Sequence, residues 1–306
     1  MRSGMDDTIY ESYRRAGKIA ANARDYGAKL VKKGASYLDV VTKIESKIIE
    51  SGGGLAFPVN ISINEIAAHF SPRHDDITLV FKKGDIVKLD VGAHIDGYIA
   101  DTALTVEVET NNHAEMIRAS RKALENAVGL MKANVGLSDV GETIEETIVS
   151  YGYKSIDNLT GHSLKRYNLH SGLSVPNVSE RLNRDKLKLE DVFAVEPFAT
   201  NGAGHVISGD NSNIYRYTGS VKSRLIRDPK TRFLAMKINK NFNALPFAER
   251  WCINVLPNTD VSISLRKLLL TGCIKQYPQL IDANKGIVTQ AEHTVIIRED
   301  GCEVTT

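Results

Sequence analysis

Carboxylates inside apolar, strand-like segments constrain this chain more than any other feature. Asp90 lies in the stretch 85–91, Asp101 in 100–108, Glu196 in 191–199 and Glu292 in 292–298. Burying an isolated charge is prohibitively costly, so a carboxylate in a buried strand needs a hydrogen bond, an ion pair or a metal. The fold must therefore bring these side chains to partners that neutralise them.

The first two carboxylates flank a hairpin-type sequence at 93–97. A turn about the Ile95–Asp96 bond places Asp90 directly opposite Asp101 on one sheet face. A turn on Asp96 and Gly97 changes the register and removes this direct pairing. Like charges that face each other destabilise a sheet. The first register therefore predicts a cation between the two carboxylates.

His162, in a glycine-containing segment at 160–164, supplies a candidate fifth ligand. Four carboxylates balance the charge of two divalent cations, and the imidazole adds a neutral donor. Oxygen-rich ligation with a single histidine suits Mn²⁺, Fe²⁺ or Co²⁺, and Zn²⁺ is also compatible. A water shared by two such ions ionises near neutral pH, which provides a nucleophile without a serine or cysteine. Each residue alone is more typical of a turn, surface or packing position; only the five together indicate a metal site.

A repeated pattern predicts an α+β fold with two duplicated halves. A long helix over 8–33 ends at Gly34, and Ser36 precedes a shorter helix. About a hundred residues later a helix over 113–132 is followed by Gly136, Ser138 and a second shorter helix. The strands between these units complete an arrangement in which helices cover an antiparallel sheet.

The chain changes character between Glu196 and Glu292. Asp228-Pro229 is typical of a helix start, and 246–256 and 260–271 also have helical patterns. We expect a catalytic domain formed by residues 5–200 and 278–306. Residues 201–277 would form a mostly helical, winged-helix-like insertion that packs against it.

Composition indicates an ordinary globular protein without a membrane segment. The 306 residues are 42% hydrophobic and 25% charged, with a net charge of +2. No run approaches the roughly 20 apolar residues of a membrane span, and the N-terminus lacks a signal-like stretch. Three scattered cysteines are more typical of reduced thiols than of a disulfide framework. We expect a cytoplasmic monomer with no membrane partner and no specific nucleic-acid partner.

Four segments, in this order, resemble the metal-ligand motifs of the methionine aminopeptidases and their pita-bread-fold relatives. They are KLDVG with DGYIAD (88–92 and 96–101), TGHSL (160–164), FAVEPFAT (193–200) and QAEHT (290–294). The segment LAFPVNISIN (55–64), followed by Ala67-Ala68-His69, and the long insertion resemble the type 2 branch in its archaeal-like form. The resemblance covers nearly the whole chain from about Thr8, and it implies the pita-bread (creatinase/aminopeptidase) fold.

The resemblance implies a role for each candidate ligand. Asp90 would bind one metal through both oxygens, and Asp101 and Glu292 would bridge two divalent ions. His162 and Glu196 would complete the second site, and Glu196 would also pass a proton to the leaving amine. The enzyme would remove the initiator methionine from nascent polypeptides whose second residue is small.

Further residues would contact the substrate. His69 and His170 would hydrogen-bond the scissile amide, and His170, eight positions after His162, would share a face with it if this segment were extended. The wall of the methionine pocket would be lined by Phe57, Phe198, Leu169 and Tyr277.

Two alternatives remain open at this point. Another pita-bread metallopeptidase, such as a Xaa-Pro aminopeptidase or dipeptidase, would use the same metal ligands. A non-catalytic pita-bread protein would act as a binding module. The near-neutral net charge neither favours nor excludes a transient ribosome contact.

Overall fold

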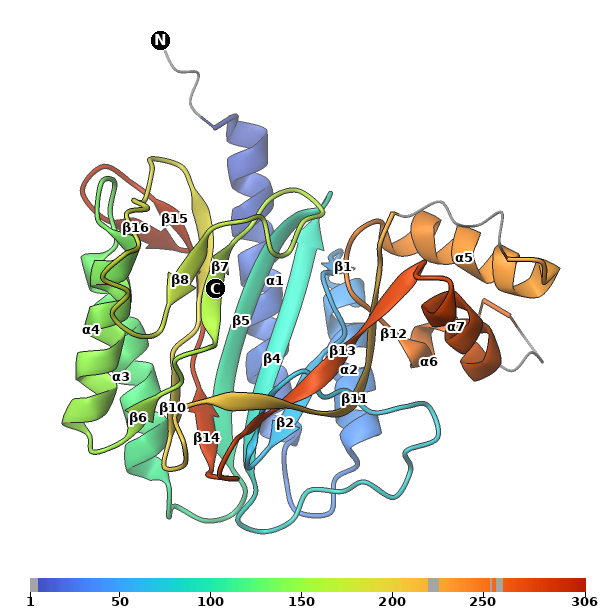
Figure 1. Ribbon diagram of the computed structural model, residues 1–306, viewed down its shortest axis with the longest axis horizontal. Helices are drawn as coiled ribbons and strands as arrows, with labels where there is room; N and C mark the ends of the chain where they lie inside the picture. Colours follow the sequence, from blue (N-terminus) through green and yellow to red (C-terminus); the bar gives the residue numbers. More distant parts are fainter. Residues whose placement is uncertain (1–4, 220–225, 254, 257–260) are drawn as a thin grey trace.

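The computed structural model describes residues 5–219, 226–253, 255, 256 and 261–306 and has an α+β architecture. Long helices cover the outer side of antiparallel strands, and a group of shorter helices projects to one side (Figure 1). Every strand pairing in the described residues is antiparallel. The expected α+β architecture, with helices covering antiparallel strands, is confirmed.

The two halves repeat one helix pair each. The first pair is α1 (Asp7–Leu30) and α2 (Tyr37–Glu50), and the second is α3 (Ala114–Leu130) and α4 (Leu137–Ser150). Ser36 caps α2 by accepting the Asp39 amide, as expected. Gly136, not Ser138, holds the equivalent position of α4 and provides no side-chain cap. Each pair packs on strands of its own half in a separate apolar cluster.

Four small sheets connect these layers. The first contains β1 (Gly54–Leu55), β4 (Ile86–Ile95), β2 (Asn60–Ile63) and β5 (Tyr98–Glu107). The second contains β14 (Val288–Gln290), β10 (Phe198–Thr200) and β6 (Lys154–Ser155). The third contains β12 (Phe247–Ala248), β11 (Val206–Tyr217), β13 (Ile274–Asp282) and β3 (Ile66–Ala68). The fourth contains β16 (Cys302–Val304), β15 (His293–Ile297), β9 (Val192–Val195), β7 (Thr160–Ser163) and β8 (Ser174–Pro176).

The segment 201–277 is less helical than the sequence pattern predicts. Its helices are α5 (Pro229–Phe242), α6 (Glu249–Cys252) and α7 (Val261–Leu270). Asp228 caps α5 as predicted, whereas the helix among the described residues of 246–256 is four residues long. Residue 254 of the predicted helix 246–256 and residue 260 of the predicted helix 260–271 lie outside the described residues.

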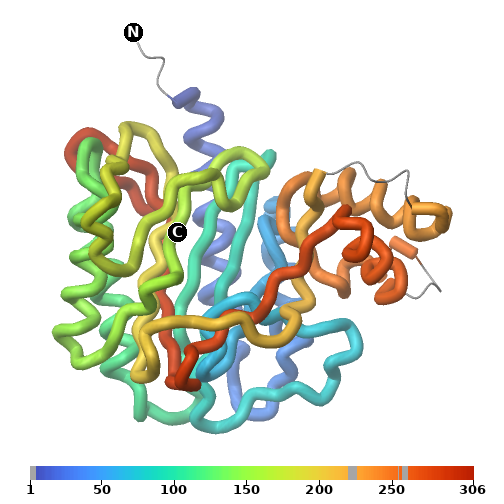
Figure 2. The backbone as a smooth tube through the Cα atoms, in the orientation of Figure 1, coloured from blue at the N-terminus to red at the C-terminus, as the bar shows by residue number. Residues whose placement is uncertain are grey.

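The strand β11 lies in a segment that the sequence pattern predicts to be mostly helical. Its pairing with β13 and β12 satisfies its backbone. Figure 2 shows β11 and β13 running side by side from the helices α5–α7 across the body of the molecule. In this way the segment 201–277 reaches the centre of the protein.

No helix among the described residues combines the length and apolar character needed to span a bilayer. All three cysteines are free thiols.

Close packing of α1 generates a stability prediction. A Cβ added at Gly27 would lie 2.4 Å from Cδ1 of Ile44 on α2 and 2.9 Å from Cδ2 of Leu89 on β4. We expect Gly27→Ala to lower the free energy of unfolding by about 1–3 kcal/mol, because this core is already filled. Gly129→Ala is the matched control, since its Cβ would meet nothing within 4 Å and alanine favours a helix by up to about 1 kcal/mol. Urea unfolding of both variants checks this, and equal effects would contradict it.

Candidate metal centre

The hairpin formed by β4 and β5 carries two of the predicted ligands. The turn lies on Asp96 and Gly97, so Asp90 pairs with Ala103 and Asp101 pairs with Gly92. The expectation that Asp90 and Asp101 lie directly opposite is therefore wrong. The two remain on one face because Asp101 faces a position two residues from Asp90, and side chains alternate with a period of two. They approach diagonally across the ladder instead.

Each of the two glutamates lies at a break between two consecutive strands. Glu196 lies between β9 and β10, and Glu292 lies between β14 and β15. Since β9 pairs with β15 and β10 pairs with β14, the breaks lie side by side. The predicted continuous strand over 191–199 is interrupted here, at Glu196 and Pro197, which removes a backbone donor.

A seam of hydrogen bonds joins the hairpin to the second half beside these ligands. The hydroxyl of Thr294 accepts the Asp101 amide N–H at 2.7 Å and donates to the Asp101 carbonyl at 2.8 Å. The hydroxyl of Thr102 donates to the Glu292 carbonyl at 2.9 Å. Ligands far apart in sequence are thus held together by their own backbones.

The fifth predicted ligand completes the group from β7. Nε2 of His162 lies 3.6 Å from Oδ2 of Asp101 and 3.7 Å from Oε1 of Glu196. One ligand atom each from Asp101, His162 and Glu292 falls within 4.8 Å of the others. All five predicted residues line one cavity, together with His69 and His170. The structure therefore brings together five residues that are far apart in the sequence.

The carboxylates repel one another, and the charge of Arg24 offsets this only as the smallest of the contributions to the Glu292 pKa. Burial raises the pKa of Asp90 to about 7. Burial raises the pKa values of Asp101, Glu196 and Glu292 well above their usual range, and repulsion among the carboxylates adds to this. Their side-chain donors within the described residues are amides. These are Gln290, at 3.3 Å from Glu196 and 3.5 Å from Glu292, and Asn60, at 3.4 Å from Asp90.

This donor set fits divalent cations. One oxygen of Asp90 and one of Asp101 are buried and receive no hydrogen bond from the described residues. Burial also lowers the pKa of His162 well below 6.5, so the imidazole is neutral and free to ligate. Four oxygen ligands and one imidazole form a site typical of divalent metals. Cation binding would displace protons from these carboxyl groups, so metal affinity should rise with pH.

Two more histidines reach the cavity from separate loops. The His69 ring lies 5.1 Å from the Tyr277 ring, and His69 has a left-handed backbone with φ of 65°. Burial lowers the pKa of His69 to about 4, so this ring is neutral at pH 7. The His170 ring lies 4.4 Å from the His162 ring at the rim of the cavity.

His170 reaches this position by a route that the sequence reasoning did not foresee. The segment from 163 to 173 is not extended. It turns back through paired hydrogen bonds between Lys165 and Asn168, at 2.9 and 3.0 Å, and a Ser171 amide that donates to Ser163. The loop between β7 and β8, not strand alternation, therefore brings His170 beside His162.

The apolar wall of the cavity contains three of the four predicted pocket residues. Phe57, Leu169 and Tyr277 line it. Phe198 does not, because it packs with Ala67, Ile156, Val206 and Val288 in a different cluster. In a regular strand Phe198 would share a face with Glu196, but the break at Pro197 ends the alternation.

The cavity also contains residues that the sequence reasoning did not single out, namely Asn60, Ala68, Ile214 and Pro246. Asn60 pairs with Asp90 across β2 and β4, and its Oδ1 is buried without a partner. A polar residue at an inward position of an apolar strand was the available signal. Ile214 and Pro246 carry no such signal, because only folding brings the segment 201–277 here.

Comparisons with known proteins agree with this geometry. The sequence profile of metallopeptidase family M24 matches residues 11–239. The methionine aminopeptidase of Methanocaldococcus jannaschii is 47% identical over 97% of this chain and 98% of its own. The crystal structure of Thermotoga maritima methionine aminopeptidase matches with a TM-score of 0.72 at 23% identity, covering 100% and 99% of the two chains. The structure of a thermophilic Arx1 matches with a TM-score of 0.86 at 17% identity, covering 99% and 91%. The chain therefore belongs to metallopeptidase family M24, as an archaeal-like member of the methionine aminopeptidases.

Proposed function

We propose that this protein hydrolyses the first peptide bond of new polypeptides and releases the initiator methionine when the second residue is small. The observation that carries the proposal is a group of four carboxylates and one histidine, buried or half-buried, that lines one cavity together with apolar side chains. The donor group supports divalent-metal hydrolysis, and the apolar wall supports recognition of an uncharged side chain.

The charge of the site supports two divalent ions, which would be Co²⁺, Mn²⁺, Fe²⁺ or Zn²⁺. Asp90, Asp101, Glu196 and Glu292 would hold these ions through carboxylate oxygens, and His162 would hold them through its imidazole. When bound, such ions lower the pKa of a coordinated water to about 7 and polarise a carbonyl group.

Side chains of the protein would carry out the remaining steps of the hydrolysis. Glu196 would hold a proton and deliver it to the leaving amine, and Gln290 orients its carboxyl group. His69 is neutral at pH 7 and would donate a hydrogen bond to the scissile carbonyl as negative charge develops. His170, on the loop between β7 and β8, would donate a second hydrogen bond to the scissile amide.

The pocket wall would hold the methionine side chain. Phe57 and Tyr277 supply rings that make favourable contacts with a thioether. Leu169, Ile214 and Pro246 add aliphatic surface. Ile214 and Pro246 line the cavity, whereas Phe198 packs in a different apolar cluster.

Loss of a bridging ligand should remove metal and activity together. We expect Asp101→Ala and Glu292→Ala to retain less metal and to fall below about a tenth of wild-type kcat/KM, because the charge balance of the site is lost. His69→Ala is the comparison variant. It should keep its metal content while kcat falls by about a hundredfold. Metal analysis with steady-state kinetics tests this, and equal metal loss in all three variants would contradict the assigned roles.

Peptide selectivity separates the proposal from the two alternatives. We expect Met-Ala-Ser to be cleaved at least about tenfold more efficiently than Xaa-Pro peptides, because the wall fits one flexible apolar side chain. Preference for Xaa-Pro peptides would favour a proline-specific relative. No hydrolysis by metal-loaded protein would favour a binding module.

We propose that the segment 201–277 forms a separate insertion subdomain. We also propose that the enzyme is cytoplasmic and that this segment makes a transient contact with the ribosome. It carries twelve Lys and Arg residues against four Asp and Glu. Several of the cations on α5 and α7 are exposed, including Lys230, Arg232, Lys240 and Arg266. We expect co-sedimentation with ribosomes that weakens by at least about tenfold between 50 and 200 mM salt, as counterion release requires. Charge reversal of Lys230, Arg232 and Lys240 should abolish it, and salt-independent binding would contradict it.

A further inference from the structure

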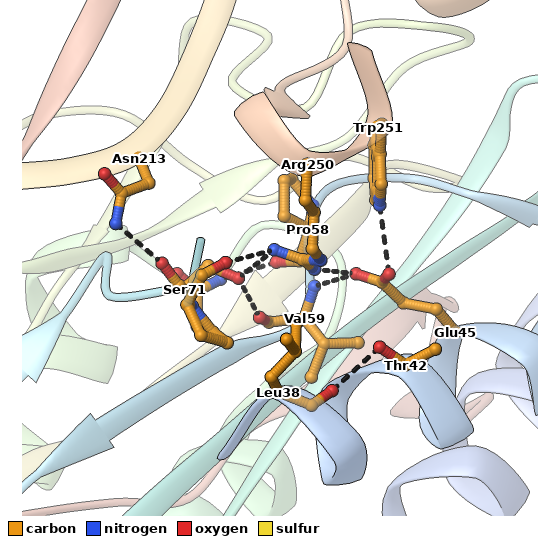
Figure 3. Close-up of polar contacts among 11 residues, drawn as sticks. Leu38, Thr42, Glu45, Pro58, Val59, Ser71, Asn213, Arg250 and Trp251 are labelled. Carbon is orange, nitrogen blue, oxygen red and sulfur yellow. Dashed lines mark hydrogen bonds and ion pairs between the residues drawn. The ribbon is translucent and has the colours of Figure 1, made fainter. Parts of the chain in front are cut away.

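A buried ion pair joins α6 to α2 close to the pocket. Arg250 on α6 contacts Glu45 on α2, and their side chains are only 6% and 9% exposed. Trp251 donates Nε1–H to the second oxygen of Glu45 at 2.9 Å (Figure 3). Neither charged residue lines the cavity, and neither has a place in the proposed chemistry. A buried pair is weak evidence for stability, since apolar replacements of similar volume are often neutral.

The same atoms hold the backbone of Val59. The Glu45 oxygen that receives Arg250 also accepts the Val59 amide N–H at 3.2 Å. The Ser71 hydroxyl donates to the Val59 carbonyl at 2.7 Å and accepts Nη1 of Arg250 at 2.8 Å (Figure 3). Both polar backbone groups of Val59 are thus fixed by one connected network.

Val59 lies between two residues of the pocket. Phe57 and Asn60 line the cavity, and Nδ2 of Asn60 bonds both the Pro58 carbonyl and Asp90. A shift of Val59 therefore moves the Phe57 ring and the Asn60 amide together. Hydrogen bonds are directional, so this network fixes their position more narrowly than apolar packing would.

The opposite wall of the pocket is attached to the same network. Pro246 lines the cavity four residues before Arg250. Asn213, beside the pocket residue Ile214, donates to the Ser71 carbonyl at 3.0 Å. The Ser71 amide also donates to the Ser212 carbonyl at 3.3 Å. The network therefore joins the wall contributed by the segment 201–277 to the wall contributed by Phe57 and Asn60.

We propose that Glu45 and Arg250 are positioning residues that set the separation of these two walls and thereby the selectivity for methionine over differently shaped side chains. The inference rests on the proposed function, which supplies the substrate. It adds that selectivity depends on a charge pair outside the pocket. The residues act through Val59 and Ser71 and do not touch the substrate.

The test compares two network variants with a matched control. Arg250→Met removes the charge pair, and Ser71→Ala removes only the hydroxyl that bridges Arg250 and Val59. Arg73→Met is the control, because Arg73 forms another ion pair with α6, to Glu249 at 3.4 Å, and takes no part in the hydrogen bonds of Val59 among the described residues. Kinetics with Met-Ala-Ser and Leu-Ala-Ser, metal analysis and tryptophan emission are measured for each. Trp251 is the only tryptophan of the chain, so its emission reports directly on the network.

We expect both network variants to keep their metal content and to raise KM for Met-Ala-Ser by about tenfold, with a smaller change in kcat. The ratio of kcat/KM for the methionine peptide over the leucine peptide should fall by about tenfold. In Arg73→Met this ratio should stay within about twofold of wild type. Arg250→Met should also shift the Trp251 emission.

Several outcomes would overturn the inference. One is an equal loss of kcat/KM for both peptides in Ser71→Ala. Another is a fall of the methionine-to-leucine ratio of kcat/KM in Arg73→Met as large as in the network variants. If Arg250→Met does not fold, Ser71→Ala decides, because it leaves every charge in place. A wild-type enzyme that cleaves neither peptide would refute the proposed function itself. Activity with unchanged selectivity in the variants would refute only the positioning role.

Discussion

Mutual repulsion among four buried or half-buried carboxylates is the constraint on which the site depends. Asp90 and Asp101 come from one hairpin, and Glu196 and Glu292 come from two strand breaks, yet all four line one cavity. Burial raises the pKa of each of them, so the ionised group needs compensating positive charge. The described surroundings supply amides, a neutral imidazole and the charge of Arg24, which is the smallest of the contributions to the Glu292 pKa. A divalent-metal centre resolves this electrostatic problem, and hydrolysis follows from it.

The duplicated architecture explains how the ligands meet. Each half covers its strands with a long and a short helix, and each half closes around its own apolar cluster. The ligands lie where the halves join, at the seam made by Thr102 and Thr294. A charged centre placed there does not interrupt either core. It is held by strand backbones, which are more rigid supports than loops.

The segment 201–277 extends the site beyond this shared centre. The strands β11 and β13 carry Ile214 and Tyr277 to the cavity, and Arg250 ties α6 to Glu45. All five candidate ligands lie outside the segment 201–277, which contributes part of the pocket wall. Substitutions in the network around Val59 can change selectivity while the ligand set stays intact.

The sequence by itself determined the helix pairs, the strands β4 and β5, and the candidate metal ligands, because each has a local signal. Helices follow apolar periodicity, and charged residues in apolar strands are conspicuous. Only the tertiary structure decided the diagonal approach of Asp90 and Asp101, since a one-position change of the turn alters the register. It also decided the route of His170, the removal of Phe198 from the pocket and the strand β11. These depend on pairing between segments distant in the chain, and no local pattern encodes such pairing.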